Sequence, residues 1–169
     1  MRPLRPEPKK SPVRHSEAMI LFGVGDVTFA IAANAVEEIR NADGLRPLAQ
    51  RKLAKVRHLL ERAGRTYYVV DAGCHFRMLP MPANRVLILR RGNVALLVQR
   101  IDLMKEVSAI YALPGAFRGE ERRWFRGLAA IPGAGGETEV VPVVNPDTLL
   151  SEDEAGMLGA LPRAKGVSA

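Results

Sequence analysis

The sequence predicts an all-β fold with a few short helices, built from two similar small β-modules. The first observation is that short apolar segments alternate with turns rich in glycine, asparagine and proline. The second is an internal echo, since residues 64–71 read GRTYYVVD and residues 136–145 read GETEVVPVVN. Each is a glycine turn followed by a short strand of β-branched or aromatic residues that ends in a small polar residue.

Composition limits the class of protein. The 169 residues and the hydrophobic fraction of 47% suffice for one domain with a real core. Cys74 is the only cysteine, which excludes an intrachain disulfide and fits a reducing compartment. The N-terminus lacks the apolar segment of a signal peptide, and no apolar run approaches the ~20 residues of a membrane helix. We therefore expect a soluble, cytoplasmic protein.

The net charge of +7 is concentrated in part of the chain. Residues 46–65 hold seven Lys or Arg against Glu61 alone. A patch of this sign attracts nucleic acid, anionic lipid or an acidic protein surface. A solvated basic face is the alternative interpretation. The seven residues are Arg46, Arg51, Lys52, Lys55, Arg57, Arg62 and Arg65.

The chain is expected to divide into an arm, a folded domain and a tail. Residues 1–17 are proline-rich and charged, a composition typical of disorder. Residues 18–151 carry the strand pattern of the domain, and residues 152–169 a short helix with a frayed end.

The first element is a hairpin over residues 19–33. Apolar residues alternate with small ones along 27–33, which predicts a strand with one buried face. Residues 19–24 form its partner, and the Gly-Asp pair at 25–26 supplies the turn.

A helical turn is expected next. Asn34 can cap it, with Glu37 at the reciprocal capping position. Val36 and Ile39 would then lie on one side of that turn.

The following segment mixes strand and helix signals. Residues 45–48 are a short strand candidate, weakened by Pro47. Apolar residues at helical spacing predict a helix over 50–57, and a longer helix competes with a strand beyond it. We expect a strand over 58–62, because the next strand needs a hairpin partner.

Strands dominate the middle of the chain. Residues 65–71 form a strand, and the prolines of 77–84 indicate a linker. Residues 85–89 and 94–100 form a second hairpin across an Asn/Gly turn. Their unbroken apolar runs predict burial on both faces.

The last strands form a third hairpin. Residues 101–107 are extended, and 116–124 form a charged loop. Residues 125–131 and 139–144 are the two strands, joined by a glycine-rich turn at 133–136.

A short helix is expected to follow. Ser151 is its N-cap and Glu154 completes a capping box. Met157, Leu158 and Leu161 give the helix an apolar side.

No residue pattern predicts catalysis, a metal or a cofactor. Cys74 and His75 are adjacent and would point to opposite faces of a strand, which makes a poor metal pair. A Cys74 nucleophile would need His58 or His75 as its base, and nothing in the sequence brings them together. We interpret Cys74 as a small buried residue.

Binding of nucleic acid is the alternative function. Small basic β-barrels are a common platform for it, but this mode needs exposed aromatic residues among the cations, and only 5% of residues are aromatic. Trp124, beside Arg122, Arg123 and Arg126, is the best stacking candidate. Its alternative role is a plug between the two modules.

The order of these elements resembles the CheW-like chemotaxis coupling domain between about residues 20 and 150. The clearest pieces are AVEEIR at 35–40, residues 64–71, residues 85–98, FRGL at 125–128, and residues 140–150. The resemblance implies two five-stranded barrels over a shared core. It also implies a non-catalytic adaptor that couples the cytoplasmic tips of methyl-accepting chemoreceptors to the regulatory domain of a histidine kinase, without membrane insertion. In this family, receptors usually occupy a groove between the barrels, and the kinase docks on a barrel end.

The resemblance also implies a set of partner contacts. Val36, Glu38 and Ile39 match the contact segment of the first barrel, while Val86, Leu87 and Val98 match the strand pair that borders the groove. Arg40, Arg62 and Arg65 could steer an acidic receptor tip. The family usually has a glycine where His58 stands, and Asn-Leu-Arg-Gly where this chain has Glu61-Arg62-Ala63-Gly64. Core positions for Val36 and Ile39, with solvated arginines, are the alternative.

Overall fold

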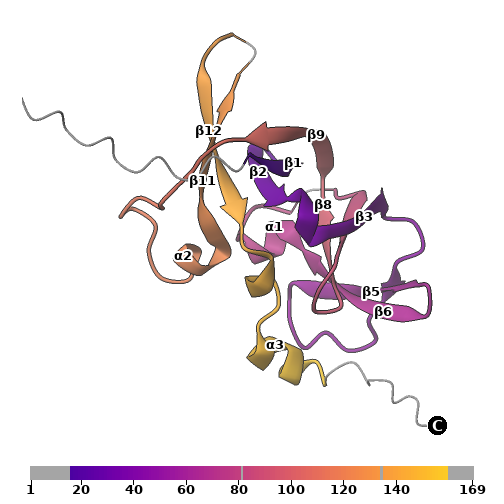
Figure 1. The fold of residues 1–169 in the computed structure, drawn as a ribbon. Helices are drawn as coiled ribbons and strands as arrows, with labels where there is room; N and C mark the ends of the chain where they lie inside the picture. Colours follow the sequence, from indigo (N-terminus) through magenta and orange to yellow (C-terminus); the bar gives the residue numbers. More distant parts are fainter. Residues whose placement is uncertain (1–15, 81, 134, 160–169) are drawn as a thin grey trace, which may run out of the picture.

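A computed structural model describes residues 16–80, 82–133 and 135–159 of the protein (Figure 1). The predicted arm lies outside these residues except for its last two positions, and so does the tail beyond Gly159, including Leu161. No helix among the described residues is long and apolar enough to cross a membrane.

The strands form two six-stranded sheets, which confirms the predicted all-β fold. The first sheet, here called the first module, has the order β10-β11-β12-β2-β1-β9, and the second has β3-β7-β8-β6-β5-β4. Each sheet has five strands of at least five residues and one of two residues. The first module contains β1 (Glu17–Val24), β2 (Val27–Ala32), β9 (Arg100–Val107), β10 (Ile110–Tyr111), β11 (Phe125–Pro132) and β12 (Thr138–Val144). The second contains β3 (Val36–Asn41), β4 (Arg46–Pro47), β5 (Val56–Arg62), β6 (Arg65–Asp71), β7 (Arg85–Leu89) and β8 (Val94–Val98).

The two similar segments, residues 64–71 and 136–145, form the same local structure. Strands β6 and β12 each pair antiparallel with the preceding strand and parallel with a strand from elsewhere, β8 and β2 respectively. The small polar residue at the end then caps a helical turn. The Asp71 carboxylate accepts a hydrogen bond from the Cys74 amide at 3.1 Å, and the Asn145 side chain accepts one from the Asp147 amide at 3.1 Å. These caps begin α1 (Ala72–His75) and η2 (Pro146–Thr148).

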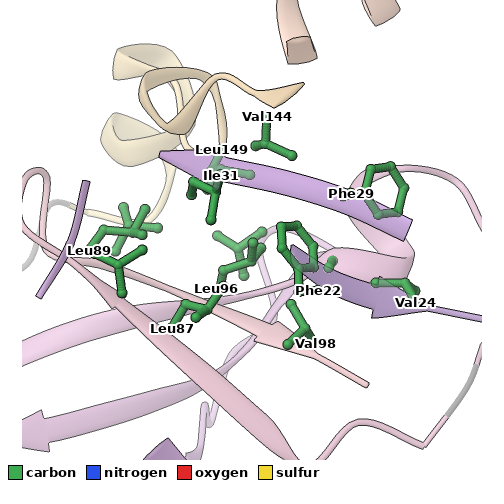
Figure 2. Close-up of a cluster of buried hydrophobic side chains, with 14 of the residues drawn as sticks. Phe22, Val24, Phe29, Ile31, Leu87, Leu89, Leu96, Val98, Val144 and Leu149 are labelled. Atoms are coloured by element: carbon green, nitrogen blue, oxygen red, sulfur yellow. The ribbon is translucent and has the colours of Figure 1, made fainter. Parts of the chain in front are cut away.

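The two modules share one hydrophobic core, and each module also has a core of its own. Along β1, Ile20 and Phe22 face the shared core, whereas Met19 and Leu21 face the interior of the first module. This split follows from the alternation of side chains along a strand. Figure 2 shows the shared core, where side chains of both sheets meet: Phe22, Val24, Phe29, Ile31, Leu87, Leu89, Leu96, Val98, Val144 and Leu149.

All three predicted hairpins are confirmed. Strands β7 and β8 are also buried on both faces, as their unbroken apolar runs predicted. Leu87 and Leu96 enter the shared core, while Val86 and Ala95 enter the interior of the second module. Complete closure of either sheet into a barrel stays a prediction.

The helical turn predicted to start at Asn34 is wrong in position and extent. The turn is the 3₁₀ helix η1 (Ala33–Ala35), which no side chain caps, and β3 begins directly after it. Val36 and Ile39 therefore lie on a strand opposite Leu89 and Leu87 of β7. Pairing with β7 satisfies the backbone groups of a segment too short for a stable helix.

The helix predicted over 50–57 is also wrong. This segment consists of bends and turns, and β5 already begins at Val56. The backbone of Lys55 pairs with that of Asp71 instead, with 2.7 Å between its carbonyl oxygen and the Asp71 amide. A tertiary contact thus overrides helical spacing over two turns.

Short helices occur where the chain leaves a strand or approaches one. Besides α1, the predicted charged loop ends in α2 (Glu121–Trp124). The predicted capping box of Ser151 and Glu154 is present and starts α3 (Glu152–Met157). Leu158 packs against the shared core, but Met157 is exposed, so only part of the predicted apolar side is buried.

Candidate functional site

A groove of about 380 Å³ lies where the two modules meet. Its apolar residues are Ala32 and Ala35 at the crossing between modules and Leu89 at the end of β7. The amide of Arg90 donates to the carbonyl of Ala35 at 3.0 Å, which fixes the β7–β8 turn against the crossing segment. The groove is lined by Ala32, Asn34, Ala35, Leu89, Arg90, Arg91, Arg126, Asn145, Pro146 and Asp147.

The rim of this groove is cationic. Arg90 and Arg91 come from the second module and are exposed, and Arg126 comes from the first. Arg126 also donates to both carboxylate oxygens of Glu17, at 3.0 and 3.2 Å. Exposed Asp147 lines the same groove, and Arg126 is already paired with Glu17. Arg90 and Arg91 are therefore the cations available to an acidic partner. An apolar floor with a charged rim is typical of a protein-docking surface.

Two of the predicted contact residues meet directly. The Arg62 guanidinium on β5 donates a hydrogen bond to the Glu38 carboxylate on β3, and Glu37 lies 3.7 Å from it. The hydrogen bond to Glu38 raises the pKa of Arg62 above its usual value. Strands β3 and β5 are the first and fifth in their sheet, so this contact shows that the second sheet curls around its own interior.

Ala63 stands where the resemblance places an arginine. It occupies the first position of a two-residue turn between Arg62 and Arg65, with φ = 51°. Its side chain therefore lies in the turn, while Arg62 at the strand end supplies the charge that reaches β3.

The other predicted polar contacts surround this pair. Ile39 and Arg40 are half-buried on β3, and His58 is half-buried on β5 opposite Val69. Arg65 is exposed at the start of β6. The contact roles of these residues stay predictions.

Four predicted contacts belong to the core instead. Val86, Leu87 and Val98 have no exposed surface, and Val36 is 6% exposed. A partner cannot touch a fully enclosed side chain without opening the fold, so direct contact by the first three is wrong. Their effect on a partner would be through the position of the strands.

A second cleft lies between α1, α2 and α3 and contains an unusual histidine. Lys55 Nζ lies 3.2 Å from His75 Nδ1 and 2.8 Å from Glu154 Oε1, so it ties α3 to the second module. The pKa of His75 is lowered to about 4, mainly by burial and also by the neighbouring Lys55 ammonium, while Glu154 opposes the shift. His75 is therefore neutral at pH 7, and its Nδ1 accepts from Lys55.

Trp124 acts as a plug at this cleft. Its ring lies 5.4 Å from His75 and 5.7 Å from Phe76, centroid to centroid, and the Arg77 guanidinium carbon stands 5.8 Å from the ring centroid. Arg77 also pairs with Glu120 at 2.7 Å. These contacts join the modules and occupy the ring that a base would stack on.

The residues weighed for catalysis do not form a reaction centre. Cys74 and His75 lie on the helical turn α1, not on a strand as assumed, and His75 Nδ1 faces Lys55, not a thiol. Within residues 16–80, 82–133 and 135–159, no group of three His, Cys, Asp or Glu could hold a metal ion.

Sequence reasoning missed two sets of surface residues. Arg90 and Arg91 were visible as a charged turn, but their approach to Arg126 depends on how the modules pack. Leu103 and Met104 are 45% and 62% exposed on β9, the last strand of the first sheet. Adjacent residues point to opposite faces of a strand, so these two expose an apolar side chain on each side of β9.

Comparisons with known proteins agree with this architecture. A model of the CheW-like domain family matches residues 18–154. The structure is similar to that of the scaffolding protein TtCheW from Thermoanaerobacter tengcongensis, with a TM-score of 0.71, 11% sequence identity, and coverage of 83% of this chain and 96% of that one. No curated protein matched the sequence.

Proposed function

Because this chain belongs to the family of CheW-like domains, we propose that it is a non-catalytic adaptor in chemotaxis-type signalling. It couples the cytoplasmic tip of a methyl-accepting chemoreceptor to the regulatory domain of a histidine kinase, and it therefore works in the cytoplasm. The observation that carries this proposal is the pair of β-modules packed over a shared core, with a partner-sized groove between them.

The groove between the modules is the proposed receptor site. Ala32 and Leu89 at its floor are buried and Ala35 is half-buried, so the floor offers a small apolar contact. The rim of Arg90 and Arg91 can pair with carboxylates of the receptor tip. The ion pair of Arg62 and Glu38 lies on β3 and β5 and holds the contact segment in place.

The apolar residues of β9 are the proposed kinase site. Leu103 and Met104 lie on β9, the last strand in the order of the first sheet. The hairpin of β11 and β12 lies near the other end of that order. The side chains of Leu103 and Met104 point to opposite faces of β9, and a partner with the same fold could pair its own strand with β9 between them.

Binding assays with purified components test the two sites separately. Charge reversal at Arg90→Glu and Arg91→Glu should weaken binding of a receptor cytoplasmic fragment at least about tenfold, because a cationic rim becomes anionic. The matched control reverses Arg51 and Arg57, which are exposed outside the groove. Equal binding by both double variants would place the receptor elsewhere.

A second pair of variants tests the proposed kinase site. Met104→Asp should weaken binding of the kinase regulatory domain and leave receptor binding unchanged. Leu79→Asp is the control, since Leu79 is 83% exposed and lies outside β9. Loss of kinase binding in both variants, or in neither, contradicts the assignment.

The nucleic-acid alternative has no support from the family, and Trp124 serves as a plug between the modules. It would regain support only if oligonucleotides bound with a steep salt dependence that Trp124→Ala abolished.

A further inference from the structure

The hairpin of β11 and β12 is apolar on its outer face as well as its inner one. On the inner face, Ala129, Ile131 and Val141 are buried in the first module. The outer positions face solvent, and the strand register makes them direct neighbours in two rows, Tyr111–Leu128–Pro142 and Ala130–Val140. We call these five residues the hairpin face.

An apolar outer face is unusual for an antiparallel sheet, where the solvent side normally carries polar residues. Tyr111 is 60% exposed and Val140 is 56% exposed. The hairpin also projects from the body of the protein, so the rest of the described chain does not cover it (Figure 1). An exposed apolar surface of this kind indicates a docking site.

Charges mark the two ends of the hairpin face. At the outer end, Glu137 is exposed in the turn of the hairpin, whereas Glu139 is paired with Ile131 and so lies on the opposite face. At the inner end, Arg126 is held by Glu17, the first residue of β1, with N–O distances of 3.0 and 3.2 Å. This ion pair places the point where residues 1–15 join the domain beside the start of the hairpin face.

Residues 1–15 have the complementary chemistry. They contain five Lys or Arg and one Glu, a net charge of +4, together with four prolines, Leu4 and Val13. Proline-rich segments bind apolar and aromatic surfaces, and basic side chains suit Glu137.

The lengths also match. The six residue steps from Arg126 to Pro132 span about 20 Å of strand. Lys9 and Lys10 precede Ser16 by seven and six residues, a number that would reach about 20 Å if extended. An arm that ran along the hairpin face would therefore bring these lysines to Glu137.

We propose that the hairpin face is a docking surface for residues 1–15 of the same chain. We choose the arm over a second copy because it is tethered beside the inner end of the hairpin face and carries a net charge of +4. Because the arm is tethered to the domain, its effective concentration at the hairpin face is of millimolar order. The arm is then an intrachain competitor, and any partner that uses the hairpin face must displace it. This inference goes beyond the proposed adaptor function.

Zero-length carbodiimide cross-linking of the full chain tests the proposal, since it joins lysines to carboxylates in contact. The expected products link Lys9 or Lys10 to Glu137. In an equal mixture of ¹⁵N-labelled and unlabelled chains, these products should contain one isotope only. Mixed-isotope products would show a second copy's arm instead, and would overturn the proposal.

A substitution that leaves the two lysines and Glu137 in place completes the test. Val140→Lys should lower the yield of these cross-links at least about fivefold, because it adds a cation to the hairpin face. The control is Leu103→Lys, an exposed apolar position on β9 of the same module. Circular dichroism and urea unfolding show whether both variants remain folded. An unchanged yield in Val140→Lys, or links spread evenly to Asp102 and Glu106, would contradict the proposal.

Discussion

Acidification from pH 7 to pH 5 should destabilise the protein through one buried histidine. His75 is 7% exposed, and its pKa lies at about 4, mainly because burial disfavours the charged ring. Lys55, whose Nζ lies 3.2 Å from Nδ1, also contributes to this lowering of the pKa, while Glu154 opposes it. In the unfolded chain the same histidine has a pKa of about 6.5.

The sign and the size follow from these two pKa values. As the pH falls below 6.5, the unfolded chain takes up a proton that the folded chain refuses, so the stability of the fold decreases. The loss is about 1.4 kcal/mol per pH unit in the steepest range, and it amounts to about 2 kcal/mol between pH 7 and pH 5. Carboxylates titrate lower, near pH 4, so this window belongs to the histidine.

Urea unfolding at pH 7, 6 and 5 measures the effect, with His75→Gln as the comparison. Glutamine keeps an oxygen that can accept from Lys55 but does not titrate. The wild type should lose about 2 kcal/mol over this range, and the variant should lose almost none. Parallel losses in the two proteins, or an NMR titration midpoint of His75 near 6.5, would refute the reasoning.

Three further substitutions should change the free energy of unfolding, measured by urea titration at pH 7. Gly127→Ala should cost about 1–3 kcal/mol, because the new Cβ would lie 2.4 Å from the backbone oxygen of Tyr111; an unchanged midpoint contradicts this close approach. Ala63→Asn should stabilise by up to about 1 kcal/mol, because asparagine tolerates the left-handed turn position better; destabilisation would exclude the two-residue turn. Ser151→Ala should cost about 1 kcal/mol through loss of the cap of α3, and no cost would mean that α3 is not held by its capping box.

The strands could be predicted because each carries its own signal. The alternation in β2 and the unbroken apolar runs of β7 and β8 report burial directly, and the turns between hairpin strands have characteristic residues. The similarity of residues 64–71 and 136–145 was also visible in the sequence. A small polar residue that ends a strand can cap the next turn, as Asp71 and Asn145 do.

The errors fall where distant contacts decide the local structure. Residues 50–57 have helical spacing, but the pairing of Lys55 with Asp71 draws the chain into an extended approach to β5. Val36 became a strand residue because β7 was available as a partner. Local sequence does not contain these contacts.

The candidate site was only partly predictable for the same reason. The resemblance named Glu38 and Arg62 as partner contacts, but their pairing with each other needs the curvature of the second sheet. The groove joins Arg90 to Arg126 from the other module, and this proximity depends on the packing of the shared core.

The most direct test of the adaptor role is bridging. A receptor cytoplasmic fragment and a kinase regulatory domain, both purified, are mixed with and without the chain and analysed by analytical ultracentrifugation. The account predicts a complex of all three components in the presence of wild-type chain, and its loss with Arg90→Glu/Arg91→Glu or with Met104→Asp. A chain that binds neither component, or that competes with one for the other without joining them, would contradict it.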